Sequence, residues 1–266
     1  MNRDELISGL KRLNLSAMIE NYENLARQCE KTNVSFEVYL GILVEGELKQ
    51  RHQSKVQRLI KAAKVPMIKL INEYDFQARE GITEKQVRHL ATGQFVRDAA
   101  NVTLYGKFGV GKSHLAMALT LELCRQGFRT LFTTAQALIT DLLEAQNTLK
   151  LSALFKKLDR FDLITIDELG YTPQQKEGAD LFFQFISQRY ERKSLMITTN
   201  LPYSEWQQVF LNPVTTEAAV DRIIHNSQTF NIIGASWRAQ EAIKRNRQKI
   251  SHPKGKNKLD EANKDD

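Results

Sequence analysis

The chain has 266 residues, 42% of them apolar, and a formal net charge of +7. This length fits one large domain or a medium domain with an appendage, and the apolar fraction supports a packed core. The two cysteines, Cys29 and Cys124, lack metal-ligand spacing and argue against a disulfide framework. The chain starts with a polar stretch unlike a signal peptide, and no uncharged apolar run approaches the roughly 18 residues that span a bilayer. We therefore expect a cytoplasmic protein without membrane attachment.

Residues 1–65 predict a small helical domain. Apolar residues recur at steps of three and four, and the pattern resumes after a break at 33–35, where Ser35 is a candidate N-cap. Pro66 is expected to end or kink the second helix. Residues 66–98 are expected to form a connector that packs on the next domain.

Positive charge is concentrated outside the centre of the chain. Residues 101–237 hold 13 basic and 13 acidic residues, whereas residues 1–100 carry a net charge of +3 and residues 238–266 a net charge of +4. The stretch 49–69 holds seven basic residues and no acid, which fits a polyanion partner. The alternative is a solvated helix face. The candidate contacts to a polyanion are Lys49, Arg51, Lys55, Arg58 and Lys61.

From residue 101 the pattern changes to strands that alternate with helices. Strands are expected at 102–105, 130–133, 162–167, 194–200 and 229–233, and helices at about 135–147, 151–158 and 178–192. Such alternation is typical of a parallel sheet with helices on both faces. The predicted fold class is therefore α/β from 99 to 245. The tail at 246–266 has no apolar periodicity and is predicted to be disordered.

A glycine-rich segment lies between the first expected strand and the following helix. Residues 106–113 read Gly-Lys-Phe-Gly-Val-Gly-Lys-Ser, the pattern G-x-x-x-x-G-K-[ST], and this context disfavours a chance glycine turn. Backbone N–H groups of such a loop wrap phosphate at the positive end of a helix dipole. Lys112 is expected to reach the β- and γ-phosphates of ATP, and Ser113 to bind Mg²⁺. The predicted nucleotide contacts are Gly106, Lys107, Phe108, Gly109, Val110, Gly111, Lys112, Ser113 and His114, with no side-chain role for Lys107 or Phe108.

Polar residues at two strand ends predict the remaining parts of a hydrolytic site. Asp167 can hold Mg²⁺ opposite Ser113, and Glu168 can polarise or orient a water for attack on the γ-phosphate. Without the glycine loop, this pair would be interpreted as an exposed turn. Asn200 can hydrogen-bond the water or the γ-phosphate, or it is a turn residue. Arg222 can supply positive charge to a neighbouring subunit's site, or form a surface salt bridge.

Five segments together resemble the IstB family, the ATP-binding helpers of insertion-sequence transposition. That family is related to DnaC-type helicase loaders within the AAA+ ATPases. The resemblance implies that the Asn200 strand lies between the phosphate-loop strand and the Asp167 strand. It also implies that Lys112 and Glu168 are catalytic, that Asn200 is sensor 1 and that Arg222 is an arginine finger. The matching segments are 106–115, 162–171, 188–191, 198–206 and 221–225.

The same resemblance implies an ATPase that works as a homo-oligomer, a ring or spiral, on duplex DNA together with a transposase. The chain departs from the family at Phe108 and Val110, where Pro and Thr are usual, and at Ser113, which replaces Thr and serves equally as a Mg²⁺ ligand. A sensor-2 role for Arg238 is left open because few residues follow the last strand. The alternatives are a DnaC-type replicative helicase loader, a small-molecule P-loop kinase and a DNA-binding scaffold with a vestigial ATP site.

Overall fold

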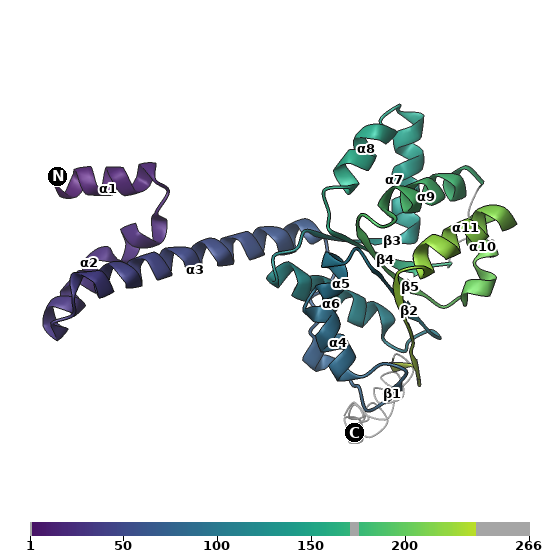
Figure 1. Ribbon diagram of the computed structural model, residues 1–266, viewed down its shortest axis with the longest axis horizontal. Coiled ribbons are helices and arrows are strands. Elements are labelled where there is room, and N and C mark those ends of the chain that lie inside the picture. Colours follow the sequence, from purple (N-terminus) through teal and green to yellow (C-terminus); the bar gives the residue numbers. More distant parts are fainter. Residues whose placement is uncertain (1, 171–175, 238–266) are drawn as a thin grey trace, which may run out of the picture.

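The computed structural model describes residues 2–170 and 176–237 (Figure 1). Arg238 and the predicted disordered tail at 246–266 lie outside these residues. Within the described ranges, no helix is long and apolar enough to cross a bilayer.

The N-terminal part is helical, as predicted, but it has one more break than the sequence pattern showed. Its helices are α1 (Arg3–Arg12), α2 (Ser16–Thr32) and α3 (Phe36–Ala63). The additional break separates α1 from α2, where Asn14 adopts a φ of 54°. Ser35 is the N-cap of α3, and its hydroxyl accepts a hydrogen bond from the Val38 N–H at 3.4 Å. The helix ends before Pro66, with Lys64 in the left-handed conformation.

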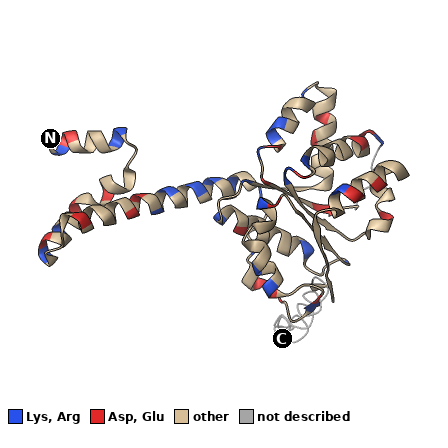
Figure 2. Cartoon of the chain, in the orientation of Figure 1, with Lys and Arg blue, Asp and Glu red and all other residues tan. Residues whose placement is uncertain are grey.

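Helix α3 joins the N-terminal helices to the sheet domain. In Figure 1, α1 and α2 lie at its far end, and its other end packs on α6 (Lys112–Arg125) and β3 (Thr130–Thr134). Its three acidic residues all precede position 48, and its basic residues follow, so the half nearer the sheet is basic (Figure 2). The helix is therefore an arm that carries positive charge close to the sheet domain.

The connector packs on the sheet domain. It contains η1 (Ile71–Glu73), β1 (Arg79–Glu80), α4 (Glu84–Ala91) and α5 (Gln94–Arg97), which the sequence pattern did not predict individually. Tyr74, Ile82, Val87 and Leu90 are buried in one cluster with residues of the sheet. The connector is thus part of the packed core next to the glycine loop.

Five parallel strands form the central sheet in the order β3-β4-β5-β2-β6. The strands besides β3 are β2 (Asn101–Tyr105), β4 (Leu163–Leu169), β5 (Ser194–Thr199) and β6 (Ser227–Asn231). The predicted position of the Asn200 strand, between the phosphate-loop strand and the Asp167 strand, is confirmed. The last strand was predicted to reach 233, but the chain leaves the sheet after Asn231. It then forms β7 (Ile233–Gly234), which pairs antiparallel with β1.

Alternate side chains of the strands enter two separate cores, one on each face of the sheet. In β4, Leu163 packs with α4, α5 and α6, whereas Ile164 and Ile166 pack on the opposite face. This period of two is what a strand buried on both faces requires. The helices on the opposite face are α7 (Ala135–Asn147), α8 (Leu151–Leu158), α9 (Lys176–Arg189), α10 (Gln207–Phe210) and α11 (Pro213–Ile224), with a short turn η2 (Tyr203–Glu205).

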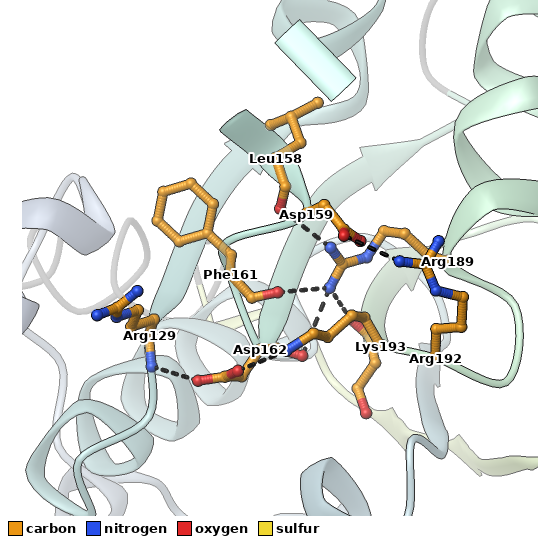
Figure 3. Close-up of polar contacts among 9 residues, drawn as sticks. Arg129, Leu158, Asp159, Phe161, Asp162, Arg189, Arg192 and Lys193 are labelled. Atoms are coloured by element: carbon orange, nitrogen blue, oxygen red, sulfur yellow. Dashed lines mark hydrogen bonds and ion pairs between the residues drawn. The ribbon is translucent and has the colours of Figure 1, made fainter. Parts of the chain in front are cut away.

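A buried arginine fixes the end of the sheet opposite the glycine loop (Figure 3). Arg189 is only 2% exposed and donates to the carbonyl oxygens of Leu158 at 3.1 Å, Phe161 at 3.1 Å, Asp162 at 3.4 Å and Ser194 at 3.0 Å. Burial lowers the pKa of this guanidinium to about 10. One side chain thus joins the end of α8 to the starts of β4 and β5.

We expect Arg189→Met to lower the free energy of unfolding by about 3 kcal/mol, because buried carbonyl groups lose their donor while most of the apolar volume remains. Arg192→Met is the matched control, since the Arg192–Asp159 ion pair at 3.0 Å is exposed and worth about 1 kcal/mol or less. Urea denaturation followed by circular dichroism measures both. Equal effects of the two substitutions would contradict this role for Arg189.

Candidate nucleotide-binding site

The glycine loop joins β2 to α6 at the carboxyl end of the sheet, and its glycines are required by the backbone. Gly106, Gly109 and Gly111 have φ values of 152°, 77° and 98°, which side chains disfavour. Neighbouring atoms also exclude a Cβ, which would lie 2.3 Å from the Ile232 carbonyl oxygen at Gly106 and 2.2 Å from Ser236 Oγ at Gly109. The loop is therefore enclosed by the chain after β6.

The backbone of the loop matches a phosphate cradle. The N–H groups of Gly109, Val110 and Gly111 donate no hydrogen bond to another residue in the described ranges. They lie directly before α6, whose N-terminal end carries positive partial charge. Donors in this position are the groups that hold phosphate oxygens in helix-terminal sites.

Lys112 is the first residue of α6 and its ammonium lies across the loop. The side chain is 6% exposed, and Nζ donates to the carbonyl oxygens of Gly106 at 2.7 Å and Lys107 at 2.9 Å. This geometry places a buried positive charge inside the glycine loop. The structure thus fits the predicted role of Lys112 towards phosphate.

Ser113 and Asp167 are brought together from α6 and β4. Ser113 Oγ donates to Asp167 Oδ1 at 2.9 Å, and the Thr198 hydroxyl of β5 donates to the same oxygen. A hydroxyl and a carboxylate are hard oxygen ligands, the type that Mg²⁺ prefers. The pair therefore fits the predicted metal site, and Thr198 is an additional orienting residue that the sequence pattern did not identify.

A β-bulge displays the neighbouring carboxylate. Ile166 pairs with Ile197 and Leu169 with Thr199, so Asp167 and Glu168 together oppose Thr198. Glu168 adopts a φ of 62°, its N–H donates to Thr198 Oγ1 at 3.0 Å, and its side chain is exposed. Bulges redirect side chains near active sites. Here the bulge leaves Asp167 buried and turns Glu168 towards solvent.

Asn200 directly follows β5 beside these carboxylates. Its Oδ1 is buried and has no hydrogen-bond partner among the residues described. An unpaired buried amide oxygen is costly unless another group occupies the site. Asn200 therefore offers a free acceptor at the carboxyl end of β5, and its contact with water or phosphate stays a prediction.

The side chains of the other predicted loop residues have different surroundings. Phe108 is 60% exposed, whereas Val110 is buried in the core. His114 Nε2 lies 3.0 Å from the Leu70 carbonyl oxygen, so its ring faces the connector. Any contact of Val110 or His114 with nucleotide would be made through main-chain atoms.

Two connector residues that sequence reasoning missed touch the loop. Tyr74 Oη and Arg79 Nε both donate to the Val110 carbonyl oxygen, at 3.2 and 2.9 Å. They lie 36 and 31 positions before Val110 in the chain. No local motif marks either residue, because the contact depends on how the connector folds back over the loop.

Arg222 lies on α11 and makes no described contact with the glycine loop of its own chain. Its Nη1 donates to the Ala218 carbonyl oxygen at 2.9 Å, and its guanidinium lies 5.2 Å from the centre of the Phe183 ring. Among the described residues Arg222 forms no salt bridge, which was the alternative interpretation. A role in a neighbouring subunit stays a prediction.

The five predicted polyanion contacts all lie on α3, but they are not equivalent. Arg51 Nε pairs with Glu47 at 2.9 Å and its Nη2 donates to the Asn14 carbonyl oxygen at 2.8 Å. Arg51 thus stabilises the helix junction. Helical spacing of about 100° per residue places Lys49 opposite Arg58.

The remaining three residues form what we call the basic stripe: Lys55, Arg58 and Lys61, all exposed on α3. At about 100° per residue they span an arc of about 120° on one side of the helix. Lys55 Nζ lies 3.6 Å from the position that a Cβ would take at Gly127, in the turn between α6 and β3. The stripe therefore begins beside the sheet domain.

Comparisons with known proteins agree with this site. The family model described as IstB-like ATP binding protein matches residues 8–245. An insertion sequence IS21 putative ATP-binding protein of Pseudomonas aeruginosa is 35% identical over 88% of this chain and 89% of its own. A homologous IS5376 protein of Geobacillus stearothermophilus is 33% identical over 86% of this chain and 92% of its own.

Solved structures of DnaC and DnaI share the fold of this chain. The DnaC helicase loader has a TM-score of 0.50 and 22% identity, over 56% of this chain and 88% of its own. DnaI has a TM-score of 0.51 and 18% identity, over 63% of this chain and 89% of its own. With a family match over most of its length, the chain belongs to the family of IstB-like ATP binding proteins.

Proposed function

We propose that this chain is an ATP-hydrolysing helper of DNA transposition that assembles on duplex DNA and acts with a transposase. The observation that carries the proposal is a phosphate loop backed by Asp167 and Glu168, in one chain with a basic helical arm. The insertion-sequence names of the relatives support the same role. Work on DNA would place the protein in the cytoplasm.

ATP is the proposed substrate, with its phosphates on the loop 106–113. Lys112 would exchange its carbonyl partners for phosphate oxygens, and Ser113 and Asp167 would hold Mg²⁺, which neutralises phosphate charge when bound. Glu168 would orient the attacking water and accept its proton. Asn200 would hydrogen-bond that water through the amide oxygen that has no described partner.

A homo-oligomer would complete the site. Arg222 is half-buried on α11, and its described contacts are with α11 and α9. Since it does not contact the glycine loop of its own chain, it would act on the glycine loop of a neighbouring subunit in the assembly. ATP bound between subunits favours the assembled state, because it binds that state more tightly than the separate chains. Removal of the γ-phosphate would weaken this preference.

Duplex DNA is proposed to lie along the basic stripe of α3. Phosphate contacts position a protein on DNA and carry no direct sequence information. An oligomer repeats the stripe in every subunit, so weak contacts add up along the duplex. Binding is then expected to depend strongly on salt.

Neutralising the stripe with Lys55→Gln, Arg58→Gln and Lys61→Gln should flatten the salt dependence of DNA binding. Each lost phosphate contact reduces the slope of log K against log salt by about 0.9, so a reduction of about 2 to 3 is expected. Fluorescence anisotropy with duplex DNA at several salt concentrations measures the slope. The matched control neutralises Lys150, Lys156 and Lys157, which are exposed at α8. An unchanged slope in the stripe variant would move the DNA surface elsewhere.

A replicative helicase loader is the second candidate function, favoured by the fold similarity to DnaC and DnaI. The two functions differ in the protein that the chain recognises. Co-purification with a transposase, tested in parallel with a DnaB-type helicase, separates them. Binding to the helicase alone would overturn the transposition proposal.

Mass measurement with ATP, with and without duplex DNA, should show an assembly that grows on DNA.

A further inference from the structure

The Val110 carbonyl in the glycine loop is held by two buried side chains from outside the loop. Tyr74 Oη and Arg79 Nε donate to its oxygen at 3.2 and 2.9 Å. Tyr74 and Arg79 are 8% and 7% exposed. Two donors on one loop carbonyl, both supplied by the connector, are more than an ordinary turn requires.

Both donors are fixed by their own surroundings. Arg79 Nη1 donates to the Ala78 carbonyl oxygen at 2.7 Å, and Arg79 pairs with Gly234 across the β1–β7 ladder. A Cβ at Gly234 would lie 2.7 Å from Arg79 Cδ, so this glycine leaves room for the arginine. The Tyr74 ring packs edge-on against the Phe76 ring, with 4.8 Å between the ring centroids. Burial raises the pKa of Tyr74 to about 12.

These contacts decide where the next N–H of the loop points. The described ranges contain no cis peptide bond, and in a trans peptide the carbonyl and the following N–H point in opposite directions. With the Val110 carbonyl turned towards the connector, the Gly111 N–H is turned away from it. Gly111 is the N-cap of α6, where backbone donors bind phosphate. The Tyr74 ring also fills the space beside Gly111, since an added Cβ there would lie 2.6 Å from Tyr74 Cε2.

We propose that Tyr74 and Arg79 are positioning residues of the phosphate loop, which hold the Val110 carbonyl on the connector side and direct the Gly111 N–H towards the phosphates of the nucleotide. The proposal rests on nucleotide binding at residues 106–113, as set out above. It gives the connector a role in nucleotide affinity, although neither side chain needs to touch the nucleotide. The affinities for ATP and for ADP should both depend on these two contacts, because both nucleotides carry the β-phosphate that such a loop wraps.

The test uses Tyr74→Phe, which keeps the ring and removes only the hydroxyl, Arg79→Met, and the double variant in the full chain. We expect each single substitution to raise the Kd for a fluorescent ATP analogue and for the matching ADP analogue by about threefold, and the pair by about tenfold. KM for hydrolysis should rise in parallel, and kcat should stay within about twofold. The Tm of Tyr74→Phe without nucleotide should stay close to that of the unmodified chain, because the Val110 carbonyl keeps its bond from Arg79. Arg79→Met removes a buried donor, so a lower Tm is expected for it and for the double variant.

Two control variants remove the same kinds of bond elsewhere. Tyr39→Phe deletes a phenol-to-carbonyl bond of 3.1 Å to Tyr22, and Arg97→Met deletes a guanidinium-to-carbonyl bond of 2.9 Å to Thr92. Neither should change nucleotide affinity. Unchanged affinity in Tyr74→Phe and in the double variant would overturn the proposal. So would a loss of affinity in Tyr74→Phe accompanied by a matching fall in Tm, which would show a purely structural role.

This experiment is independent of the proposed role on DNA. Nucleotide affinity is measured without DNA or transposase, so a failed positioning test leaves the transposition function standing. Absence of DNA binding would overturn that function without altering these affinities. If the double variant does not fold, the Tyr74→Phe result decides alone, since that substitution preserves the packing of the ring.

Discussion

Glu168→Gln should lower ATP turnover by about 100-fold or more and leave ATP affinity nearly unchanged, because a carboxamide keeps the shape of the side chain but cannot accept a proton. The structure separates Glu168 from its neighbour. Asp167 is buried and accepts hydrogen bonds from Ser113 and Thr198, whereas the bulge turns Glu168 to solvent. Steady-state phosphate release and binding of a fluorescent ATP analogue measure the two effects.

The same variant should accumulate as an ATP-bound oligomer on DNA, visible as a larger mass in light scattering. Glu144→Gln on α7 is the matched control, because Glu144 is exposed and lies outside the site. Turnover at the level of this control would remove Glu168 from the catalytic role. A loss of ATP binding equal to the loss of turnover would instead assign Glu168 to substrate binding.

Arg222→Ala should lower turnover by about a thousandfold and spare ATP binding, which is the expected loss when an arginine finger is removed. The guanidinium stabilises charge that develops on the phosphate oxygens in the transition state, and it matters little in the ground state. Arg88→Ala is the control, since Arg88 forms an exposed ion pair within α4. Turnover by Arg222→Ala at the level of this control would show that Arg222 is not the finger.

Mixing two inactive variants tests whether Arg222 acts on a neighbouring subunit. A subunit with Arg222→Ala has an intact Glu168, and a subunit with Glu168→Gln has an intact Arg222. Mixed oligomers therefore contain some complete sites if the arginine acts between subunits, and turnover should recover in part. If Arg222 acts within its own chain, no complete site can form and the mixture stays inactive.

The sequence predicted those parts of the site that lie in short, continuous patterns. The residue types and spacing from Gly106 to Ser113 predict a phosphate-binding loop, and the apolar run before Asp167 predicts a buried strand. Strand positions were predicted to within about two residues because the strands are short runs of β-forming residues bounded by turn residues. The α4, α5 and α10 helices were not predicted, since they span only eight, four and four residues, and α11 was not predicted although it spans 12 residues.

Contacts between distant segments could not be predicted in the same way. Arg51 was predicted to bind a polyanion, but its partner Glu47 is buried against the start of α2, where it accepts the Ala17 N–H at 2.9 Å. A run of basic residues in the sequence does not indicate which of them forms an ion pair with an acidic residue in the folded chain. The same holds for Arg189, whose four carbonyl partners come from three different segments.

By itself the sequence determined the nucleotide loop, the two carboxylates and the positions of the five central strands along the chain, because each is fixed by residue types at local spacing. Only the tertiary structure decided how these parts face one another. The bulge that places both Asp167 and Glu168 opposite Thr198 depends on the strand register between β4 and β5. The hold of Tyr74 and Arg79 on the Val110 carbonyl depends on the connector folding back over the loop. Such directional contacts require atoms within about 3 Å of each other, a distance that packing sets and that no local pattern encodes.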